Sequence, residues 1–180
     1  FSSIATIVID NSQLHKDLKN EFQKRLEIEQ KNKEQERRAK ETVKKQNVEL
    51  KEAYIDSIHR LVLASEFKDE ETGDHIIRIG EYSRVIAEEL GWPENEIEII
   101  KYAAPMHDVG KIGIADKIML KPGKLNDDEF EIIKTHTKIG AKILSKSKSD
   151  ILKMAREIAL CHHEKFNGEG YPSGLRKEQI

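Results

Sequence analysis

The 180-residue sequence is 37% hydrophobic and 36% charged, with 31 Lys and Arg residues against 33 Asp and Glu residues. This length provides a core for one domain but not for several. Because the charges balance, the chain as a whole has no electrostatic attraction to nucleic acid polymers or to a membrane surface. No apolar run is long enough for a membrane span. The single cysteine, Cys161, excludes an internal disulfide framework and favours a reducing compartment, so we expect a cytoplasmic location.

The first 72 residues predict one long helix. All ten glycines and all four prolines lie at or after Gly73, so nothing upstream breaks a helix. The stretch 29–36 has no apolar residue, whereas apolar residues recur at helical spacing on both sides of it. These residues are Leu14, Leu18, Phe22 and Leu26 upstream, and Val43, Leu50, Ala53, Ile58 and Leu61 downstream. The pattern favours a parallel two-stranded coiled coil and hence a homodimer; a solvated single helix or a flexible charged linker is the alternative.

Shorter helices are predicted after Gly73, over 74–90, 94–107, 127–145 and 150–163. Asn126 and Ser149 stand at the N-cap positions of the last two, and Glu129 follows Asn126 at the spacing of a capping box. No segment alternates with period two. The predicted fold class is therefore all-α, a helical bundle preceded by a long N-terminal helix.

Histidines and carboxylates in the second part of the chain indicate a metal centre. Five of the seven histidines lie there, with two acidic neighbours, and the set is Glu71, His75, His107, Asp108, His136, His162 and His163. Such side chains converging from several helices are typical of dinuclear sites in bundles. A set of nitrogen and oxygen donors without sulfur favours iron, manganese, zinc or nickel over magnesium or calcium. Seven ligands exceed the needs of one ion, so we expect two or three, with Asp108 as a bridge.

Each of these residues also has a purely structural explanation. His136 shares an apolar helix face, and His162 and His163 are suited to the negative end of a helix dipole. Taken together, however, five buried imidazoles without a metal would each require a separate hydrogen-bond partner.

A pair of metal ions can activate water for an in-line displacement at phosphorus, which points to phosphoester hydrolysis. Lys111 follows Asp108 by three residues, and Lys117, Lys121 and Lys124 lie in the next loop. Lysine binds phosphate as a point charge, so these residues predict an anionic substrate. A solvated loop is the alternative for Lys117 and Lys124.

Two motifs resemble a known family. H-D-V-G-K at 107–111 resembles the HD superfamily of metal-dependent phosphohydrolases, and H-H-E-K-F-N-G-E-G-Y-P at 162–172 resembles the signature of its HD-GYP subfamily. The stretches E-T-G-D-H at 71–75 and D-K-I-M-L-K-P-G-K-L at 116–125 resemble further blocks of that subfamily. The resemblance covers residues 54–180 and implies an HD-type helical bundle.

The resemblance implies a cyclic di-GMP phosphodiesterase that forms pGpG and, in many members, GMP, using two or three iron or manganese ions. The seven residues of the metal set would be the ligands, with Asp108 and Lys111 catalytic. Substrate would contact Lys111, Lys121, Tyr171 and Pro172, and Gly170-Tyr171-Pro172 would also dock a diguanylate cyclase domain. Asn167 stands where the family often has Asp. The family continues beyond Ile180 with another metal-binding Asp, so we expect a domain truncated at its C-terminus.

The resemblance also divides the chain. Residues 1–20 resemble the last helix of a GAF sensory domain, 21–53 would be a helical coiled-coil linker, and 54–180 the phosphohydrolase domain. Two other functions stay open: a non-catalytic cyclic di-GMP receptor or cyclase-docking module, and a general HD nucleotide phosphohydrolase.

Overall fold

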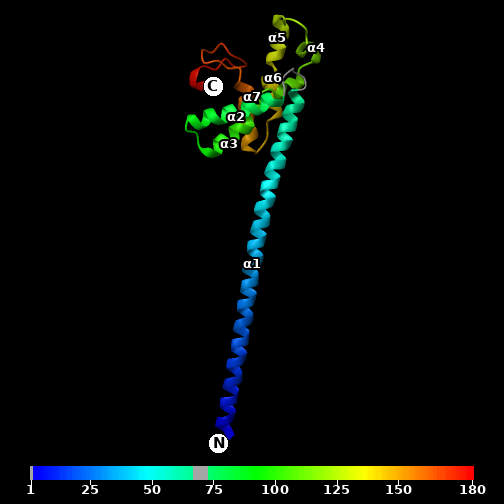
Figure 1. Ribbon diagram of the computed structural model, residues 1–180. Coiled ribbons are helices and arrows are strands. Elements are labelled where there is room, and N and C mark those ends of the chain that lie inside the picture. The colour runs from blue at the N-terminus through cyan, green and yellow to red at the C-terminus, as the bar shows by residue number, and fades with distance from the viewer. Residues whose placement is uncertain (1, 67–72) are drawn as a thin grey trace. The chain divides into compact units, whose positions relative to one another are not determined.

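The computed structural model describes residues 2–66 and 73–180, which are helical with connecting loops and contain no strand. Figure 1 shows the elements in chain order. The α-helices are α1 (Ser2–Glu66), α2 (Gly73–Glu89), α3 (Glu94–Ala103), α4 (Asp116–Met119), α5 (Asp127–Lys134), α6 (His136–Ile143) and α7 (Asp150–Cys161). Three 3₁₀ segments are η1 (Ala104–Met106), η2 (Val109–Gly113) and η3 (Lys177–Gln179). The predicted all-α class is confirmed.

Helix α1 is continuous, as the absence of glycine and proline predicts. Oppositely charged side chains one turn apart pair along its surface, including Glu21 with Arg25, Glu29 with Lys33 and Glu36 with Lys40. Each such exposed pair contributes only a few tenths of a kcal/mol. Phe22 and Leu50 are 64% and 70% exposed in the single chain, so pairing of two helices stays a prediction. No helix in the described ranges combines the length and apolar composition that crossing a membrane requires.

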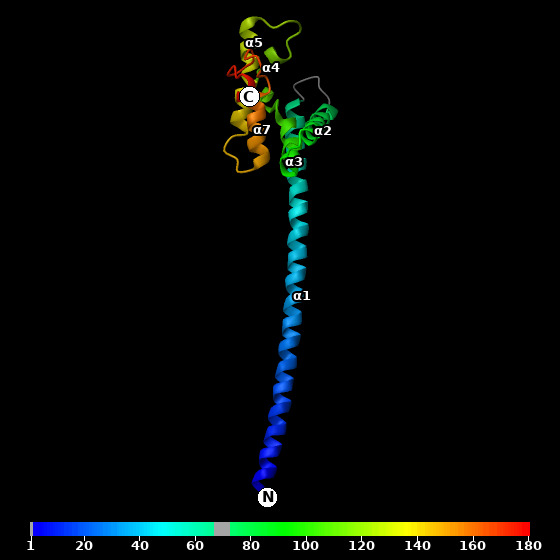
Figure 2. The same ribbon diagram turned by 90° about the vertical axis from the view of Figure 1, so that its left-hand side faces the viewer.

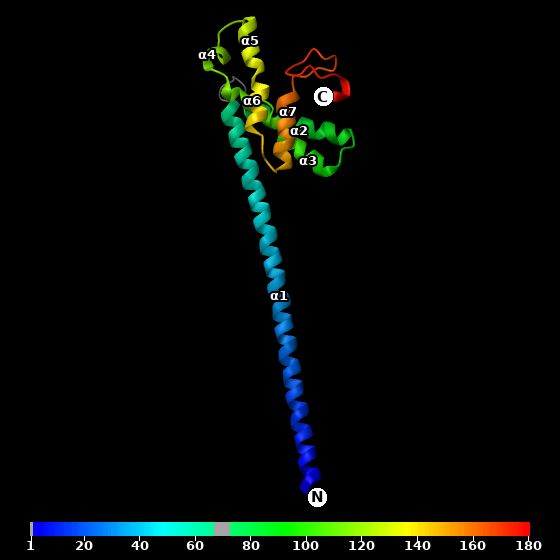
Figure 3. The ribbon, with the colours of Figure 1, turned by 180° about the vertical axis from the view of Figure 1, so that it is seen from behind.

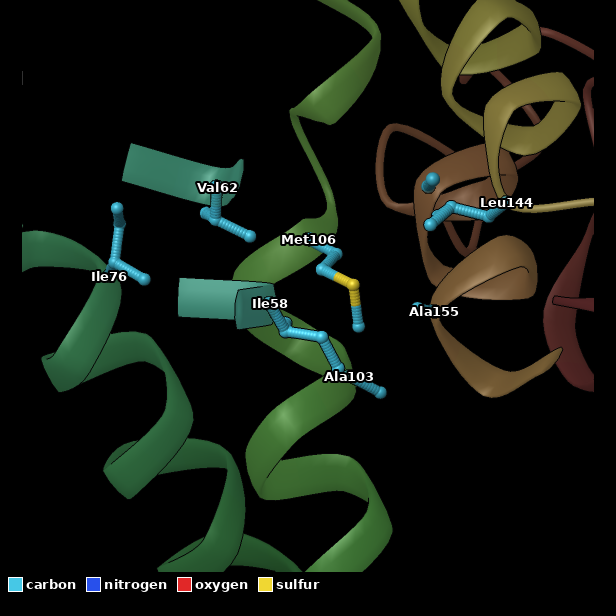
Figure 4. Packing of buried hydrophobic residues seen from close by; sticks show 8 residues of the cluster. Ile58, Val62, Ile76, Ala103, Met106, Leu144 and Ala155 are labelled. Atoms are coloured by element: carbon cyan, nitrogen blue, oxygen red, sulfur yellow. The ribbon is translucent and has the colours of Figure 1, made fainter. Parts of the chain in front are cut away.

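The chain forms two compact units, which divide between Ala53 and Tyr54. The second unit has its own hydrophobic core, made of Ile58 and Val62 of α1, Ile76, Ala103, Met106, Leu144, Ala155 and Ala159. In Figure 4 Met106 lies between Ile58 and Val62 on one side and Leu144 and Ala155 on the other. Helix α2 packs on α3, and α7 packs on both α3 and α6, as the views in Figures 2 and 3 also show. This packing brings the ends of α3, α6 and α7 together.

Two predicted helices are interrupted in the structure. The one predicted over 94–107 ends as an α-helix at Ala103 and tightens into η1, because Pro105 has no N–H for an α-helical hydrogen bond. The prediction of one helix over 127–145 was wrong: α5 ends at Lys134, and α6 begins at His136. At the break, the Thr135 N–H and hydroxyl both donate to the Ile132 carbonyl, at 3.0 and 2.6 Å. This turn ends α5 and makes His136 the first residue of α6.

The predicted caps have different outcomes. Asn126 and Glu129 form the predicted capping box, since Asn126 Oδ1 accepts from the Glu129 N–H and Glu129 Oε2 from the Asn126 N–H, at 2.8 and 2.9 Å. Ser149 stands at the N-cap position of α7 but does not cap it. Its Oγ instead accepts from the Tyr54 hydroxyl at 3.1 Å. The short helix α4 lies in a segment predicted to be a loop.

Candidate metal centre

Four side chains offer ligand atoms that all lie within 4.8 Å of one another: Asp108, His136, His162 and His163. Asp108 lies in the turn between η1 and η2, His136 begins α6, and the two other histidines follow the last residue of α7. Segments far apart in the sequence therefore supply one cluster, because η2 and α7 both pack on α6.

Glycine makes this close packing possible. A Cβ atom added at Gly110 would lie 1.9 Å from the His136 carbonyl oxygen and 2.5 Å from the Gly140 nitrogen. Both are backbone atoms, so no side-chain movement would relieve the clash. The backbone of η2 can therefore lie directly against α6 only with glycine at this position. This contact fixes Asp108 beside His136.

Backbone carbonyls orient three imidazoles. The Nδ1 atoms of His107 and His136 contact the carbonyls of Ala104 and Ile133 at 3.1 and 2.6 Å. The Nδ1 atom of His162 contacts the carbonyls of Ile158 and Ala159, both at 3.1 Å. A carbonyl oxygen only accepts hydrogen bonds, so each Nδ1 carries the proton and each Nε2 presents a lone pair. This is the tautomer and the outer hydrogen bond typical of histidines that bind metals through Nε2.

The lone pairs converge on one point. His136 Nε2 lies 3.2 Å from His162 Nε2, and these atoms lie 3.2 and 3.4 Å from Asp108 Oδ1. Asp108 Oδ1 is buried and has no hydrogen-bond partner among the described residues. Electron-rich atoms this close, without protons between them, repel one another unless a cation lies among them. The residues therefore fit a divalent cation.

The second carboxylate oxygen of Asp108 faces other groups. Oδ2 lies 2.9 Å from Lys111 Nζ and 3.1 Å from His107 Nε2. The Lys111 ammonium beside this oxygen favours the ionised form of the Asp108 carboxyl. Asp108 is therefore an anion whose two oxygens face different groups. Oδ1 faces His136 and His162, and Oδ2 faces His107 and Lys111. A ligand that bridges two ions requires such an arrangement.

His163 is held differently. Its ring is stacked on that of Tyr171, with centroids 4.5 Å apart and an interplanar angle of 23°. Burial, reinforced by His162 and His136, lowers the pKa of His163 to about 4, so its imidazole is neutral at neutral pH and able to bind a metal. Burial and the charge of Asp108 raise the pKa of the Tyr171 hydroxyl.

The remaining predicted residues lie around this cluster or outside it. His75 is half-buried in the first turn of α2 and is not one of the four clustered residues, and Glu71 lies outside the described residues. Lys121 Nζ contacts both carboxylate oxygens of Glu129, at 2.8 and 2.6 Å. Tyr171 and Pro172 line a groove of about 270 Å³ with Glu131, Lys134, Thr135 and Lys138. Pattern reasoning gave no role to Lys134 or Glu164, although Glu164 directly follows the histidine pair.

The fold and site define a helical domain built around a buried histidine and carboxylate centre suited to divalent metal ions. The chain belongs to the HD domain family, whose model matches residues 29–180. This confirms the family that the His107–Lys111 and His162–Pro172 motifs indicate. The GAF-like origin of residues 1–20 and the boundaries at 20 and 53 stay predictions.

Curated relatives carry related names. The chain is 53% identical over 120 residues to a cyclic di-GMP phosphodiesterase of Thermotoga maritima, covering 67% of this chain and 33% of that protein. It is 42% identical over 132 residues to the cyclic di-GMP phosphodiesterase response regulator RpfG of Xanthomonas campestris, covering 73% and 35%. It is 41% identical over 133 residues to the 3'3'-cGAMP-specific phosphodiesterase 2 of Vibrio cholerae, covering 74% and 26%. The matched region thus spans about a third or less of each relative.

Proposed function

We propose that this chain carries the catalytic site of a metal-dependent phosphodiesterase that hydrolyses cyclic di-GMP to pGpG and, in a further step, to GMP. The observation that carries the proposal is the convergence of two imidazole lone pairs on the buried, hydrogen-bond-free Asp108 Oδ1. The names of the relatives support the substrate, since two of those compared are cyclic di-GMP phosphodiesterases.

The proposed cofactors are two or three divalent ions, iron or manganese. Asp108, His136, His162 and His163 would hold them, and the family resemblance adds His107, His75 and Glu71. The nitrogen-rich, sulfur-free donor set supports these metals over calcium or magnesium. When bound, such ions stabilise negative charge on a phosphoryl group and lower the pKa of a bound water.

The other proposed roles belong to side chains that face the substrate. Lys111 has a side chain only 16% exposed and its ammonium next to Asp108, so it can hold a phosphate oxygen beside the cluster. Tyr171 and Pro172 would form the wall against which the substrate binds, since they line the groove next to His163. Lys121 would have to exchange Glu129 for a substrate phosphate.

Regulation forms a second part of the proposal. A parallel homodimer through α1 would bury its exposed apolar residues, such as Phe22 and Leu50, and would connect an upstream GAF-like sensor to the catalytic domain. The Gly170-Tyr171-Pro172 segment is only partly buried, which leaves it accessible to a diguanylate cyclase domain. The signalling nucleotide implies that the protein acts in the bacterial cytoplasm.

A second cyclic dinucleotide is the alternative substrate. The Vibrio cholerae relative is named as specific for 3'3'-cGAMP and is 41% identical to this chain over the matched region. Cyclic di-GMP and 3'3'-cGAMP share the cyclic phosphodiester, so the metal centre by itself does not discriminate between them.

The test combines elemental analysis with a substrate panel. The intact protein, prepared without oxygen, would be assayed for iron and manganese and then for cleavage of cyclic di-GMP, 3'3'-cGAMP and a nucleoside triphosphate. We expect bound metal and preferential cleavage of cyclic di-GMP. His136→Gln should lose both, whereas His59→Gln, which changes an exposed histidine of α1, should lose neither. Binding of cyclic di-GMP without metal or cleavage would favour a receptor, and cleavage of the triphosphate alone a general nucleotide phosphohydrolase.

A further inference from the structure

The contacts that orient His163 differ from those that orient the other histidines of the site. His107, His136 and His162 each direct Nδ1 to a backbone carbonyl. Within the described part of the chain the ring of His163 has no hydrogen bond, and its nearest ring contacts are His162 at 4.2 Å and the stacked Tyr171 at 4.5 Å. Among the described residues, ring contacts rather than a backbone carbonyl therefore hold the His163 imidazole.

Glu164 closes the loop that carries Tyr171. Its Oε1 accepts from the Ser173 N–H at 2.7 Å, and its Oε2 from the Leu175 N–H at 2.9 Å. These two charge-assisted bonds join residues 9 and 11 positions apart and return the loop to the end of α7. A third hydrogen bond ties the same loop to the end of α7, since the Tyr171 N–H donates to the His163 carbonyl at 3.2 Å.

The loop lies directly on the backbone that precedes it. A Cβ atom added at Gly170 would lie 2.4 Å from the Lys165 nitrogen and 2.5 Å from the Glu164 Cα atom. On its other side, the Tyr171 ring meets the Phe130 ring at a centroid distance of 6.4 Å and Lys134 Nζ at 5.5 Å. The aromatic ring is thus confined between α5 and His163.

We propose that Glu164 is a positioning residue for metal binding. Its carboxylate holds the loop closed, the closed loop holds Tyr171 against His163, and the stacking fixes the imidazole that must present a lone pair to the metal. Without this support the His163 ring would gain rotational freedom that metal binding must then remove. The inference rests on the proposed metal centre and adds a role for a residue outside the ligand set.

The first measurement is the affinity of the intact protein for Mn²⁺, by competition with a chelator. Glu164→Gln keeps one acceptor but turns an amide NH₂ toward a backbone N–H, so we expect about tenfold weaker binding, as for other outer-shell changes. The matched control is Glu157→Gln, which makes the same charge change on α7, where Glu157 is 58% exposed and contacts Arg156. This control should bind Mn²⁺ as the wild type does.

Two substitutions of Tyr171 provide an independent test. Tyr171→Phe retains the stacked ring and should retain the affinity, whereas Tyr171→Leu removes the ring and should weaken binding as Glu164→Gln does. This comparison keeps the inference testable even if Glu164→Gln does not fold. Equal affinities of the Phe and Leu variants would overturn the role of stacking.

A double variant separates positioning from general destabilisation. If Glu164 acts through Tyr171, adding Glu164→Gln to Tyr171→Leu should cause little further loss of affinity. Independent effects would multiply, to about a hundredfold loss, and would overturn the inference. Wild-type protein that fails to bind Mn²⁺ would refute the metal centre and this role together. Wild-type binding that Glu164→Gln leaves unchanged would refute the positioning role alone.

Discussion

Replacing Gly110 by alanine should destabilise the domain far more than the same change three residues later. The added Cβ at Gly110 would lie 1.9 Å from the His136 carbonyl oxygen, so the backbones of η2 and α6 must separate by about 1.5 Å to restore a van der Waals contact. At Gly113 the Cβ would lie 2.9 Å from Ile139 Cγ2, a side-chain atom that can give by a few tenths of an ångström without separating two backbones. Overpacking of a rigid site costs roughly 1–3 kcal/mol or more. We expect about 3 kcal/mol for Gly110→Ala and under about 1 kcal/mol for Gly113→Ala.

Urea denaturation of the metal-free protein would measure the free energy of unfolding of each variant, and Mn²⁺ titration would measure the affinity of its metal site. Gly110→Ala should also weaken metal binding, because separation of η2 from α6 moves Asp108 away from His136. Gly113→Ala should bind Mn²⁺ with the affinity of the wild type. A smaller loss of stability for Gly110→Ala than for Gly113→Ala would refute the reasoning, as would an intact metal site in a strongly destabilised Gly110→Ala protein.

Asp108→Ala should lose metal and activity together, whereas Lys111→Ala should keep its metal and raise KM for cyclic di-GMP about tenfold; full metal occupancy in Asp108→Ala would contradict the bridging role. The pKa of His163 in the folded protein, about 4, lies below the ordinary value of 6.5, so the unfolded chain binds more protons between these values. The metal-free protein should lose stability as the pH falls from about 6.5 to about 4, by at most about 3 kcal/mol before solvent screening reduces it. Urea midpoints across that window should depend less on pH in His163→Gln, and an unchanged dependence would exclude His163 as the source. Deleting four residues within 29–36 should rotate the following helix by about 40° and disturb regulation more than deleting seven, which rotates it by about 20°. Phosphodiesterase rates with and without the sensory ligand would test this, and equal behaviour of both deletions and the wild type would make α1 a passive tether.

The sequence by itself determined the features that depend on neighbouring residues. A chain without glycine or proline before Gly73 forms the continuous α1, because each α-helical hydrogen bond joins residues only four apart. The Asn126 capping box follows from a spacing of three. The two histidine motifs indicated the family because their residue types are required by the chemistry, whatever the packing around them.

Tertiary structure decided which of these residues meet and how each is oriented. The turn at Thr135 separates α5 from α6 and makes His136 the first residue of a new helix, although the apolar periodicity runs on through it. The approach of η2 to α6 at Gly110 and the Glu164 bonds to the loop join positions 9 to 30 residues apart. Periodicity does not encode such contacts, because they depend on how closely two backbones approach once the core has packed. The orientation of each imidazole therefore follows from the fold, whereas its presence follows from the sequence.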